Sequence, residues 1–314
     1  MKNTSLFLLA GAVLSLSMNV AHARLKLIPQ VDMAAVEAGI DDYRLGSEWG
    51  KRKITDKSVL NETASFQRAA LATTYLPVGG TGFYLGKFAG KHVVATNHHV
   101  CPSERSCLGD QADFRLLKKK FKITKFYITL PNVDLTLLSI DVPAADEAVM
   151  SKVAKNFAFN KHIQKGTNLI TVGFGVAGNR FNNVMGNNDS DCKVFSQNAE
   201  YKLLADPDEL NPASYKAWSF SHGCDVSHGD SGSAIVERDS SDVIGIVWTG
   251  KIPKEEVAQN SKILAEMLKT SSPLIWKELS YAVPAVKIKE FLLPLSTDEA
   301  LDSETRSVFT ALIR

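Results

Sequence analysis

Residues 228–234 read His-Gly-Asp-Ser-Gly-Ser-Ala, and this stretch is the strongest local signal in the chain. A serine between two glycines lets the backbone turn sharply while the hydroxyl stays exposed. The same turn can bring backbone N–H groups toward one point, where they would stabilise a developing negative oxygen. Gly/Ser turns between strands are also common without any catalytic role. The stretch therefore gains meaning only if the chain also supplies a base for Ser231 and a group that orients that base.

A candidate base lies upstream, where residues 93–101 read Val-Val-Ala-Thr-Asn-His-His-Val-Cys. An apolar strand here ends in a turn that presents two imidazoles, those of His98 and His99. A neutral imidazole can take a proton from a serine near physiological pH. A single histidine at a strand end is more often structural, so with two present one of them can be spare.

A candidate orienting group lies between these stretches, where residues 132–138 read Asn-Val-Asp-Leu-Thr-Leu-Leu. An aspartate directly before an apolar strand is often only a turn residue. If Asp134 reaches the histidine, a buried carboxylate there would fix the imidazole tautomer and stabilise its charged form. The three stretches follow one another in the chain order His, Asp, Ser. Chymotrypsin-type barrels use this order, whereas subtilisins and α/β-hydrolases do not.

The chain resembles bacterial secreted serine peptidases of the trypsin-like and glutamyl-endopeptidase-like kind. Residues 96–100 resemble their histidine motif, residues 134–138 look like their aspartate strand, and residues 229–233 resemble their nucleophile turn. The resemblance covers roughly residues 54–290. This family places its catalytic histidine just before the valine, which assigns the role to His99 and leaves His98 at a variable polar position.

The resemblance implies an all-β fold of two antiparallel six-stranded β-barrels, chymotrypsin-like, with the site in the cleft between them and a C-terminal helix. It implies that Ser231 attacks a peptide carbonyl, that His99 shuttles the proton and that Asp134 orients His99. The N–H groups of Gly229 and Ser231 would hold the oxyanion, and water would release the acyl-enzyme. Such a site needs no metal and no organic cofactor.

The hydrophobic pattern supports the fold class independently, because short runs rich in Val, Ile, Phe, Tyr and Thr recur between turn residues. They do not alternate with long helical patterns, which disfavours a parallel α/β fold. Helical spacing occurs late in the chain, at residues 254–269 and 286–293. The expected strands are residues 82–85, 92–95, 126–129, 135–140, 169–174, 234–236 and 243–248.

The N-terminus predicts export. Lys2, an apolar run over residues 6–16 and the small-x-small site at residues 21–23 form a secretory signal over residues 1–23. The apolar run is too short to span a bilayer comfortably. We expect an N-terminal extension or pro-segment at 24–53, a peptidase domain at 54–294 and a polar tail at 295–314. The protein would be periplasmic or secreted.

Composition narrows the class of partner. The 314 residues are 45% apolar and 22% charged, which is typical of a globular chain, and the formal net charge is +2. This charge predicts neither a nucleic-acid partner nor a stable association with membranes. We expect a monomer that acts on protein or peptide substrates.

The four cysteines allow three pairings, and export makes disulfides possible. We favour Cys101–Cys107 and Cys192–Cys224, because the second bridge would tie a long loop to the segment before Ser231. A metal site is the rival reading, but no two cysteines have a Cys-x-x-Cys spacing, which disfavours zinc.

Asp230 and Asp225 suggest finer properties by resemblance. In trypsin-like zymogens the acid before the nucleophile receives a new N-terminal amine after cleavage, and Lys53-Ile54 is a candidate bond, with Arg68-Ala69 as an alternative. Asp230 could instead simply bond nearby backbone. An acid at the offset of Asp225 binds Arg or Lys in the specificity pocket of trypsin-like enzymes, although Cys224-Asp225 also resembles a structural pair.

Other residues near the cleft follow from the same resemblance. Glutamyl endopeptidases carry a histidine where this chain has Val247, which disfavours specificity for Glu. Val247, Trp248 and Gly250 belong to the strand expected to line the cleft and pair with substrate backbone. We expect His222 and His228 to be exposed loop residues.

Two other functions are alternatives to a serine endopeptidase. The first is a catalytically inactive trypsin-fold protein that acts as a binding protein or adhesin. The second is an esterase with a Gly-Asp-Ser motif. Such esterases place Asp and His after the serine, which is the reverse of the order here.

Overall fold

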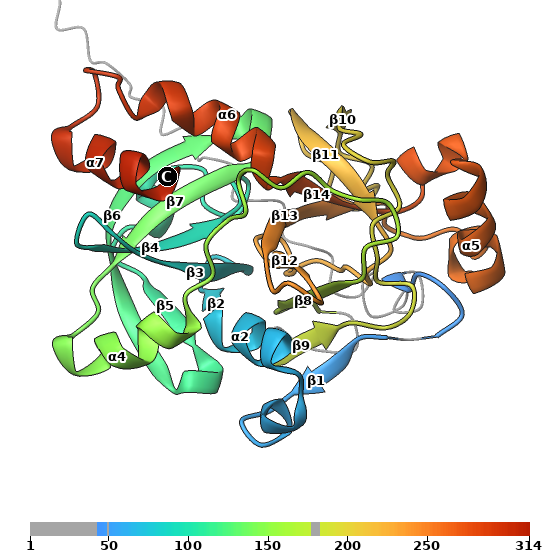
Figure 1. Ribbon diagram of the computed structural model, residues 1–314, viewed down its shortest axis with the longest axis horizontal. Helices are drawn as coiled ribbons and strands as arrows, with labels where there is room; N and C mark the ends of the chain where they lie inside the picture. Colours follow the sequence, from blue (N-terminus) through green and yellow to red (C-terminus); the bar gives the residue numbers. More distant parts are fainter. Residues whose placement is uncertain (1–42, 49, 177–182) are drawn as a thin grey trace, which may run out of the picture. The chain divides into compact units, whose positions relative to one another are not determined.

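A closed six-stranded antiparallel barrel forms the first half of the molecule (Figure 1), in the strand order β2-β3-β4-β7-β6-β5. The computed structural model describes residues 43–48, 50–176 and 183–314. Every residue of β7 is buried, in keeping with its run Leu-Thr-Leu-Leu-Ser-Ile at the centre of the sheet. The strands are β2 (Thr73–Leu76), β3 (Gly80–Phe88), β4 (Lys91–Thr96), β5 (Gln111–Phe114), β6 (Lys119–Leu130) and β7 (Leu135–Ile140).

The second half is an eight-stranded antiparallel sheet in the order β1-β9-β8-β12-β13-β14-β11-β10. Six strands form its centre, and β1 and β10 are added at its two edges. The strands are β1 (Arg52–Ile54), β8 (Leu169–Gly173), β9 (Val184–Asn187), β10 (Lys202–Ala205), β11 (Lys216–His222), β12 (Ala234–Glu237), β13 (Val243–Gly250) and β14 (Ser280–Pro284).

A short segment connects the two sides of this second sheet. Lys193 forms an isolated bridge with Asn168, just before β8, and Val194 forms one with His222 at the end of β11. The amide of Phe195 also donates to the carbonyl of Ser221 at 3.0 Å. The sheet therefore curls back on itself, and the all-β, chymotrypsin-like two-barrel class is confirmed.

Short helices separate some of the strands in the sequence, and two further helices follow the last strand. They are α2 (Ala64–Ala72), α3 (Glu104–Cys107), α4 (Ala144–Val153), α5 (Ser261–Thr270), α6 (Ala285–Leu295) and α7 (Ser303–Leu312). Five 3-10 helices lie among the described residues, at Ser58–Asn61, Arg115–Leu117, Pro131–Val133, Glu256–Gln259 and Pro273–Trp276. The structure confirms helical segments near residues 254–269 and 286–293 and the C-terminal helix of the fold.

The last twenty residues differ from the expected polar tail. Asp302 caps α7 by accepting the amide of Thr305 at 2.9 Å, and the helix buries Val308, Phe309 and Leu312. The ring of Phe309 packs edge-on against Tyr127 of β6, with 6.4 Å between centroids. Burying each large apolar side chain stabilises the fold by about 1.5–3 kcal/mol. The segment is thus part of the first barrel's packing.

The N-terminal segment, here residues 43–48 and 50–53 of the expected extension, is also part of the fold. β1 pairs with β9, with Ile54 opposite Val184, and Ile54 is 3% exposed. The domain boundary expected after Lys53 therefore falls inside a strand. The signal expected at residues 1–23 lies outside the described residues.

Candidate active site

His99 and Asp134 meet at one end of the first barrel. β4 ends at Thr96 and leads into the turn that carries His99, and the neighbouring β7 begins directly after Asp134. The imidazole Nδ1 of His99 lies 2.8 Å from Oδ2 of Asp134, and the His99 amide donates to Oδ1 at 3.1 Å. The side-chain amide of Asn97 donates to the Asp134 carbonyl at 2.8 Å, which fixes the turn. This arrangement leaves the other nitrogen of His99, Nε2, to face a reacting group.

The electrostatics of the pair suit a base that becomes charged during reaction. Asp134 is fully buried, whereas the side chain of His99 is 27% exposed. Burial disfavours the imidazolium, but the carboxylate of Asp134 outweighs burial and raises the pKa of His99 above its ordinary value. Asp134 would therefore stabilise the positive charge that His99 acquires on taking a proton.

His98 makes different contacts. Its Nδ1 lies 2.6 Å from Oγ1 of Thr129, and its ring packs edge-on against Tyr215 at 5.2 Å between centroids. Burial lowers the pKa of His98, so this imidazole stays neutral at physiological pH. Of the two neighbouring histidines, the one that the sequence singled out is the one hydrogen-bonded to Asp134.

Tyr215 is a member of the site that sequence reasoning missed. Its hydroxyl donates to Oδ1 of Asp134 at 2.7 Å and lies 3.3 Å from Nδ1 of His99. Tyr215 precedes β11 of the second sheet, and its ring packs against Trp248 at 6.2 Å between centroids. Burial, together with the charge of Asp134, raises the pKa of Tyr215, so the phenol stays a donor. No motif surrounds Tyr215 that could have revealed this role.

The turn that carries Ser231 docks on the first barrel through Thr81 of β3. The Thr81 amide donates to the Ser231 carbonyl at 2.9 Å, and the Thr81 hydroxyl donates to the Gly229 carbonyl at 2.6 Å. Gly232 has a φ of +89°, and a Cβ there would lie 1.9 Å from the Thr81 carbonyl and 2.7 Å from the Thr96 hydroxyl. Thr96 ends the strand that leads to His99, so the serine turn lies against the histidine's own strand.

Backbone N–H groups in this turn alternate between bonded and unbonded. The amide of Asp230 donates to Ser227 at 3.0 Å, and that of Gly232 donates to Val247 at 2.9 Å. The amides of Gly229 and Ser231 donate to no acceptor among the described residues. An oxyanion site at this turn requires N–H donors that have no other acceptor, and the amides of Gly229 and Ser231, on either side of Asp230, meet this requirement.

The hydroxyl of Ser231 makes no hydrogen bond to any residue that the structure describes, and it is partly exposed. Hydrogen bonds between nucleophile and base are often long or misaligned without substrate and tighten in the substrate complex. The structure therefore brings the serine turn and the His99–Asp134 pair to the same end of β3 and β4, with the serine hydroxyl unengaged.

The strand expected to line the cleft is β13. The amide and carbonyl of Val247 bond to Ser233 and Gly232, so this residue holds the serine turn. Trp248 is 1% exposed, and its indole donates to Ser219 at 2.8 Å. A Cβ on Gly250 would lie 3.2 Å from Nζ of the buried Lys254. Pairing of this strand with substrate stays a prediction.

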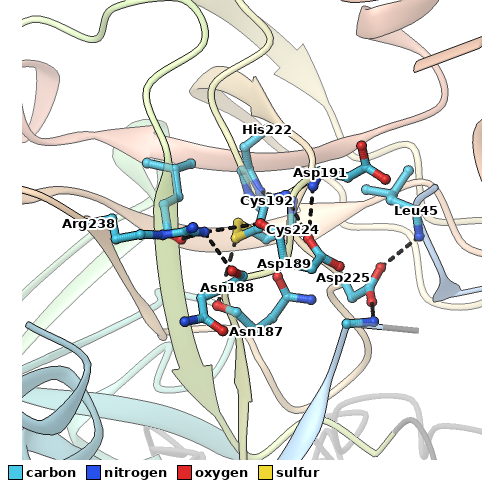
Figure 2. Close-up of a disulfide and its surroundings, with 12 residues drawn as sticks. Leu45, Asn187, Asn188, Asp189, Asp191, Cys192, His222, Cys224, Asp225 and Arg238 are labelled. Atoms are coloured by element: carbon cyan, nitrogen blue, oxygen red, sulfur yellow. Dashed lines mark hydrogen bonds between the residues drawn. A yellow bond between two sulfur atoms is a disulfide. The ribbon is translucent and has the colours of Figure 1, made fainter. Parts of the chain in front are cut away.

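Asp225 lies under the N-terminal segment rather than beside an open pocket. Its Oδ1 accepts the amide of Leu45 at 2.7 Å, as Figure 2 shows, and its Oδ2 accepts that of Gly50 at 3.0 Å. Asp225 is fully buried, and burial raises its pKa to about 7 in spite of these bonds. Binding of a basic substrate side chain by Asp225 stays a prediction, and it requires Leu45 and Gly50 to move away from Asp225.

The disulfides join Cys101 to Cys107 and Cys192 to Cys224, the pairing that the sequence favoured. The second bridge lies directly before Asp225 (Figure 2). It ties the segment that closes the second sheet to the loop leading to Ser231.

The expectation that His222 and His228 are exposed is wrong. His222 is fully buried at the end of β11, and burial lowers its pKa to about 3. His228 is 8% exposed, and its Nε2 lies 2.8 Å from Oδ2 of Asp208. Segments distant in sequence bury both residues: His222 pairs with Ser280 of β14 and with Val194, and Tyr43 lies against His228, at 3.4 Å from hydroxyl to Nδ1.

Metal ligation and membrane crossing find no support in the part of the chain that the structure describes. No group of three or more His, Cys, Asp or Glu side chains in this part could hold a metal ion. Within the same residues, no helix has the length and apolar character needed to cross a membrane.

Comparisons with known proteins gave matches to solved structures. No family model matches the chain. No curated protein matches it either. The inactive form of a serine-to-alanine mutant of Rv3671c from M. tuberculosis H37Rv is similar at a TM-score of 0.48 and 16% identity, over 80% of this chain and 99% of that one. The Rv3671c protease in its inactive and active forms matches at a TM-score of 0.46 and 17% identity in each case. These matches cover 77% and 78% of this chain, and 98% and 90% of those chains.

Proposed function

We propose that the protein is a serine endopeptidase that hydrolyses peptide bonds through Ser231, His99 and Asp134. The observation that carries the proposal is the hydrogen bond between His99 Nδ1 and the fully buried Asp134 carboxylate, beside a serine turn docked on the adjoining strand. Nδ1 is thereby engaged, and Nε2 is left to act as the base toward a serine hydroxyl.

The reaction follows from these roles. The Ser231 hydroxyl attacks the substrate carbonyl while His99 takes its proton, and Asp134 stabilises the imidazolium. The unbonded amides of Gly229 and Ser231 donate to the carbonyl oxygen as it becomes negative. His99 then gives its proton to the leaving amine, and an acyl-enzyme remains. Water, activated by His99, hydrolyses the ester and restores Ser231.

The test uses the full-length protein with a fluorescent casein and a fluorophosphonate probe that labels activated serines. We expect hydrolysis and labelling by the unmodified protein, and a loss of at least about 10³-fold in Ser231→Ala. Ser307→Ala is the matched control, because Ser307 is an exposed residue of α7. A folded protein that neither hydrolyses casein nor takes up the probe would instead be the inactive binding protein.

Two finer properties belong to the same proposal. We infer a preference for Arg or Lys at the residue before the cleaved bond, from the position of Asp225, and profiling on a peptide library measures it. Loss of that preference in Asp225→Asn would support the role. An unchanged profile would assign Asp225 to holding Leu45 and Gly50 alone.

We also propose that the protein is exported to the periplasm or the medium. The pattern of residues 1–23 supports this, and so do the two disulfides, since such bonds persist in oxidising compartments. Fractionation of expressing cells and sequencing of the N-terminus test it. A cytosolic protein that retains Met1 would contradict it.

A further inference from the structure

A buried ion pair lies next to the candidate nucleophile. Lys51, the residue before β1, contacts the carboxylate of Asp230 through its ammonium group. The two side chains are 1% and 2% exposed, so the pair is shielded from water. The same ammonium donates to the hydroxyl of Ser227 at 3.1 Å. The ammonium group of Lys51 thus contacts Asp230, the residue that directly precedes Ser231 in the chain.

Asp230 holds the serine turn in place through its carboxylate. Oδ1 accepts the amide of Gly175 at 3.0 Å, and Oδ2 accepts the amide of Ser227 at 2.8 Å. These bonds tie the turn that contains Gly229 and Ser231 to Ser227, just before it, and to Gly175, in the segment that follows β8. Removing a carboxylate from water is costly, and a neighbouring cation offsets that cost. Lys51 supplies that cation, and removing it would leave Asp230 uncompensated.

The backbone of Gly175 lies close against the ion pair of Lys51 and Asp230. A Cβ on Gly175 would lie 2.2 Å from Nζ of Lys51 and 2.1 Å from Oδ2 of Asp230, so backbone closes over the pair. An amine made by cleavage before Ile54 would have to displace Lys51. Ile54 would also have to leave β1, where it is buried and paired with Val184.

The same N-terminal segment is fixed at a second point. The amide of Leu45 donates to Asp225 in the loop that leads to the turn (Figure 2), and the amide of Gly50 donates to the same carboxylate. The amide of Gly46 donates to the carbonyl of Ala258 at 2.9 Å. These contacts hold the backbone around Lys51, so that its side chain is delivered to Asp230 without a chain break.

We propose that Lys51 is a positioning residue that shapes the serine turn through Asp230, so that the peptidase proposed above works with residues 43–53 still attached. The proposal rests on that function. Cleavage at Lys53-Ile54 would then remove the cation on which Ser231 depends, and it would inactivate the protein instead of activating it.

The sharpest test compares two lysines two positions apart. Lys51→Met removes the buried cation at similar length, and we expect kcat to fall at least about 100-fold with a smaller change in KM, since the turn loses its alignment. Lys53→Gln is the control, because Lys53 is exposed, and it also removes the basic residue of the candidate cleavage bond. We expect Lys53→Gln to retain its activity.

A double variant separates the ion pair from simple packing. In Lys51→Met/Asp230→Asn no buried charge is left without a partner, and we expect at least tenfold recovery of the kcat lost in Lys51→Met. A loss of packing alone would not be reversed by Asp230→Asn. Thermal unfolding of each variant shows whether it folds.

Mass spectrometry of probe-labelled, unmodified enzyme completes the test without any variant. We expect the labelled chain to retain residues 43–53. Labelled enzyme that begins at Ile54, an inactive Lys53→Gln, or full kcat in Lys51→Met would each overturn the proposal. In those cases the unmodified protein still hydrolyses casein, whereas failure of the proposed function removes that activity altogether.

Discussion

The two halves of the candidate site are supported in different ways. The His99–Asp134 pair is held mainly by its own barrel, through the amide of His99 and the side chain of Asn97, and Tyr215 adds one hydrogen bond from the second half. The Ser231 turn is held by residues far from it in the sequence, by Lys51 on one side and by Thr81 on the other. The comparison teaches that the base is preformed by local strand geometry, whereas the nucleophile depends on contacts between residues far apart in sequence, such as that between Thr81 and Gly229 at a separation of 148.

We expect the largest effect on kcat when the His99–Asp134 pair is disrupted. Asp134→Asn retains the size of the side chain but removes the charge that stabilises the imidazolium and can select the wrong tautomer of His99. We expect kcat to fall about 10⁴-fold, measured on the casein substrate or a peptide derived from it. Asp239→Asn, at an exposed position, is the control and should leave kcat unchanged. A loss of less than tenfold in Asp134→Asn would contradict the assigned role.

The contact between the two halves is tested by Gly232→Ala. The new Cβ would lie 1.9 Å from the Thr81 carbonyl, so the serine turn must move away from the first barrel. Since a displacement of about 1 Å can cost about 10²-fold in rate, we expect a loss of that size in kcat.

Gly90→Ala is the matched control for that variant. Gly90 has a φ of +81°, close to the +89° of Gly232, but a Cβ added at Gly90 would meet nothing within 4 Å. Both variants bear a similar backbone strain of about 1–2 kcal/mol, visible in thermal unfolding. Equal activity in the two variants would show that the clash at Thr81 does not matter.

Tyr215 crosses from the second sheet to the first barrel, and its removal should have a smaller effect. Tyr215→Phe deletes the hydrogen bond to Asp134 and keeps the ring against Trp248. We expect about a tenfold drop in kcat, equivalent to about 1.4 kcal/mol. Tyr201→Phe is the control, since that hydroxyl contacts only Ile163 and His162 in the described residues. Full kcat in Tyr215→Phe would make its contact with Asp134 structural only.

The parts of the fold that depend on local pattern could be predicted from the sequence. The mostly apolar run at 135–140 is β7 to the residue, since a strand buried on both faces reads as a near-continuous apolar stretch. The choice of His99 over His98 follows from the resemblance, which places the catalytic histidine just before the valine at position 100. Both predictions rest on residues adjacent in the chain.

Some missed features had a local signal. α7 carries an Asp302 cap and then Val308, Phe309 and Leu312 at helical spacing, although the segment begins with polar residues. α2 likewise follows a capping Thr63, whose hydroxyl accepts the Phe66 amide at 3.3 Å.

Other features had no such signal, because their partners are distant in sequence. The contact of Lys51 with Asp230 spans 179 residues, and that of Tyr215 with Asp134 spans 81. Neither Lys51 nor Tyr215 belongs to a motif, and only the packing of the second sheet brings these two residues to the site. The burial of His222 and His228 has the same origin, since it depends on distant chain that covers their loop.

The smallest expected effect concerns pH and distinguishes the two histidines. His99 must be neutral to accept a proton, and Asp134 raises its pKa above the ordinary 6.5. The rate kcat/KM should therefore increase with pH and reach half of its maximum above pH 6.5. In Asp134→Asn the raising charge is absent, so the residual activity should have its midpoint at lower pH. His98→Gln should move the midpoint by less than about half a unit, because burial lowers the pKa of His98 and keeps it neutral across this range. A midpoint below pH 6.5 in the unmodified protein, or one that follows His98 and not Asp134, would show that the local half of the site is not organised around His99.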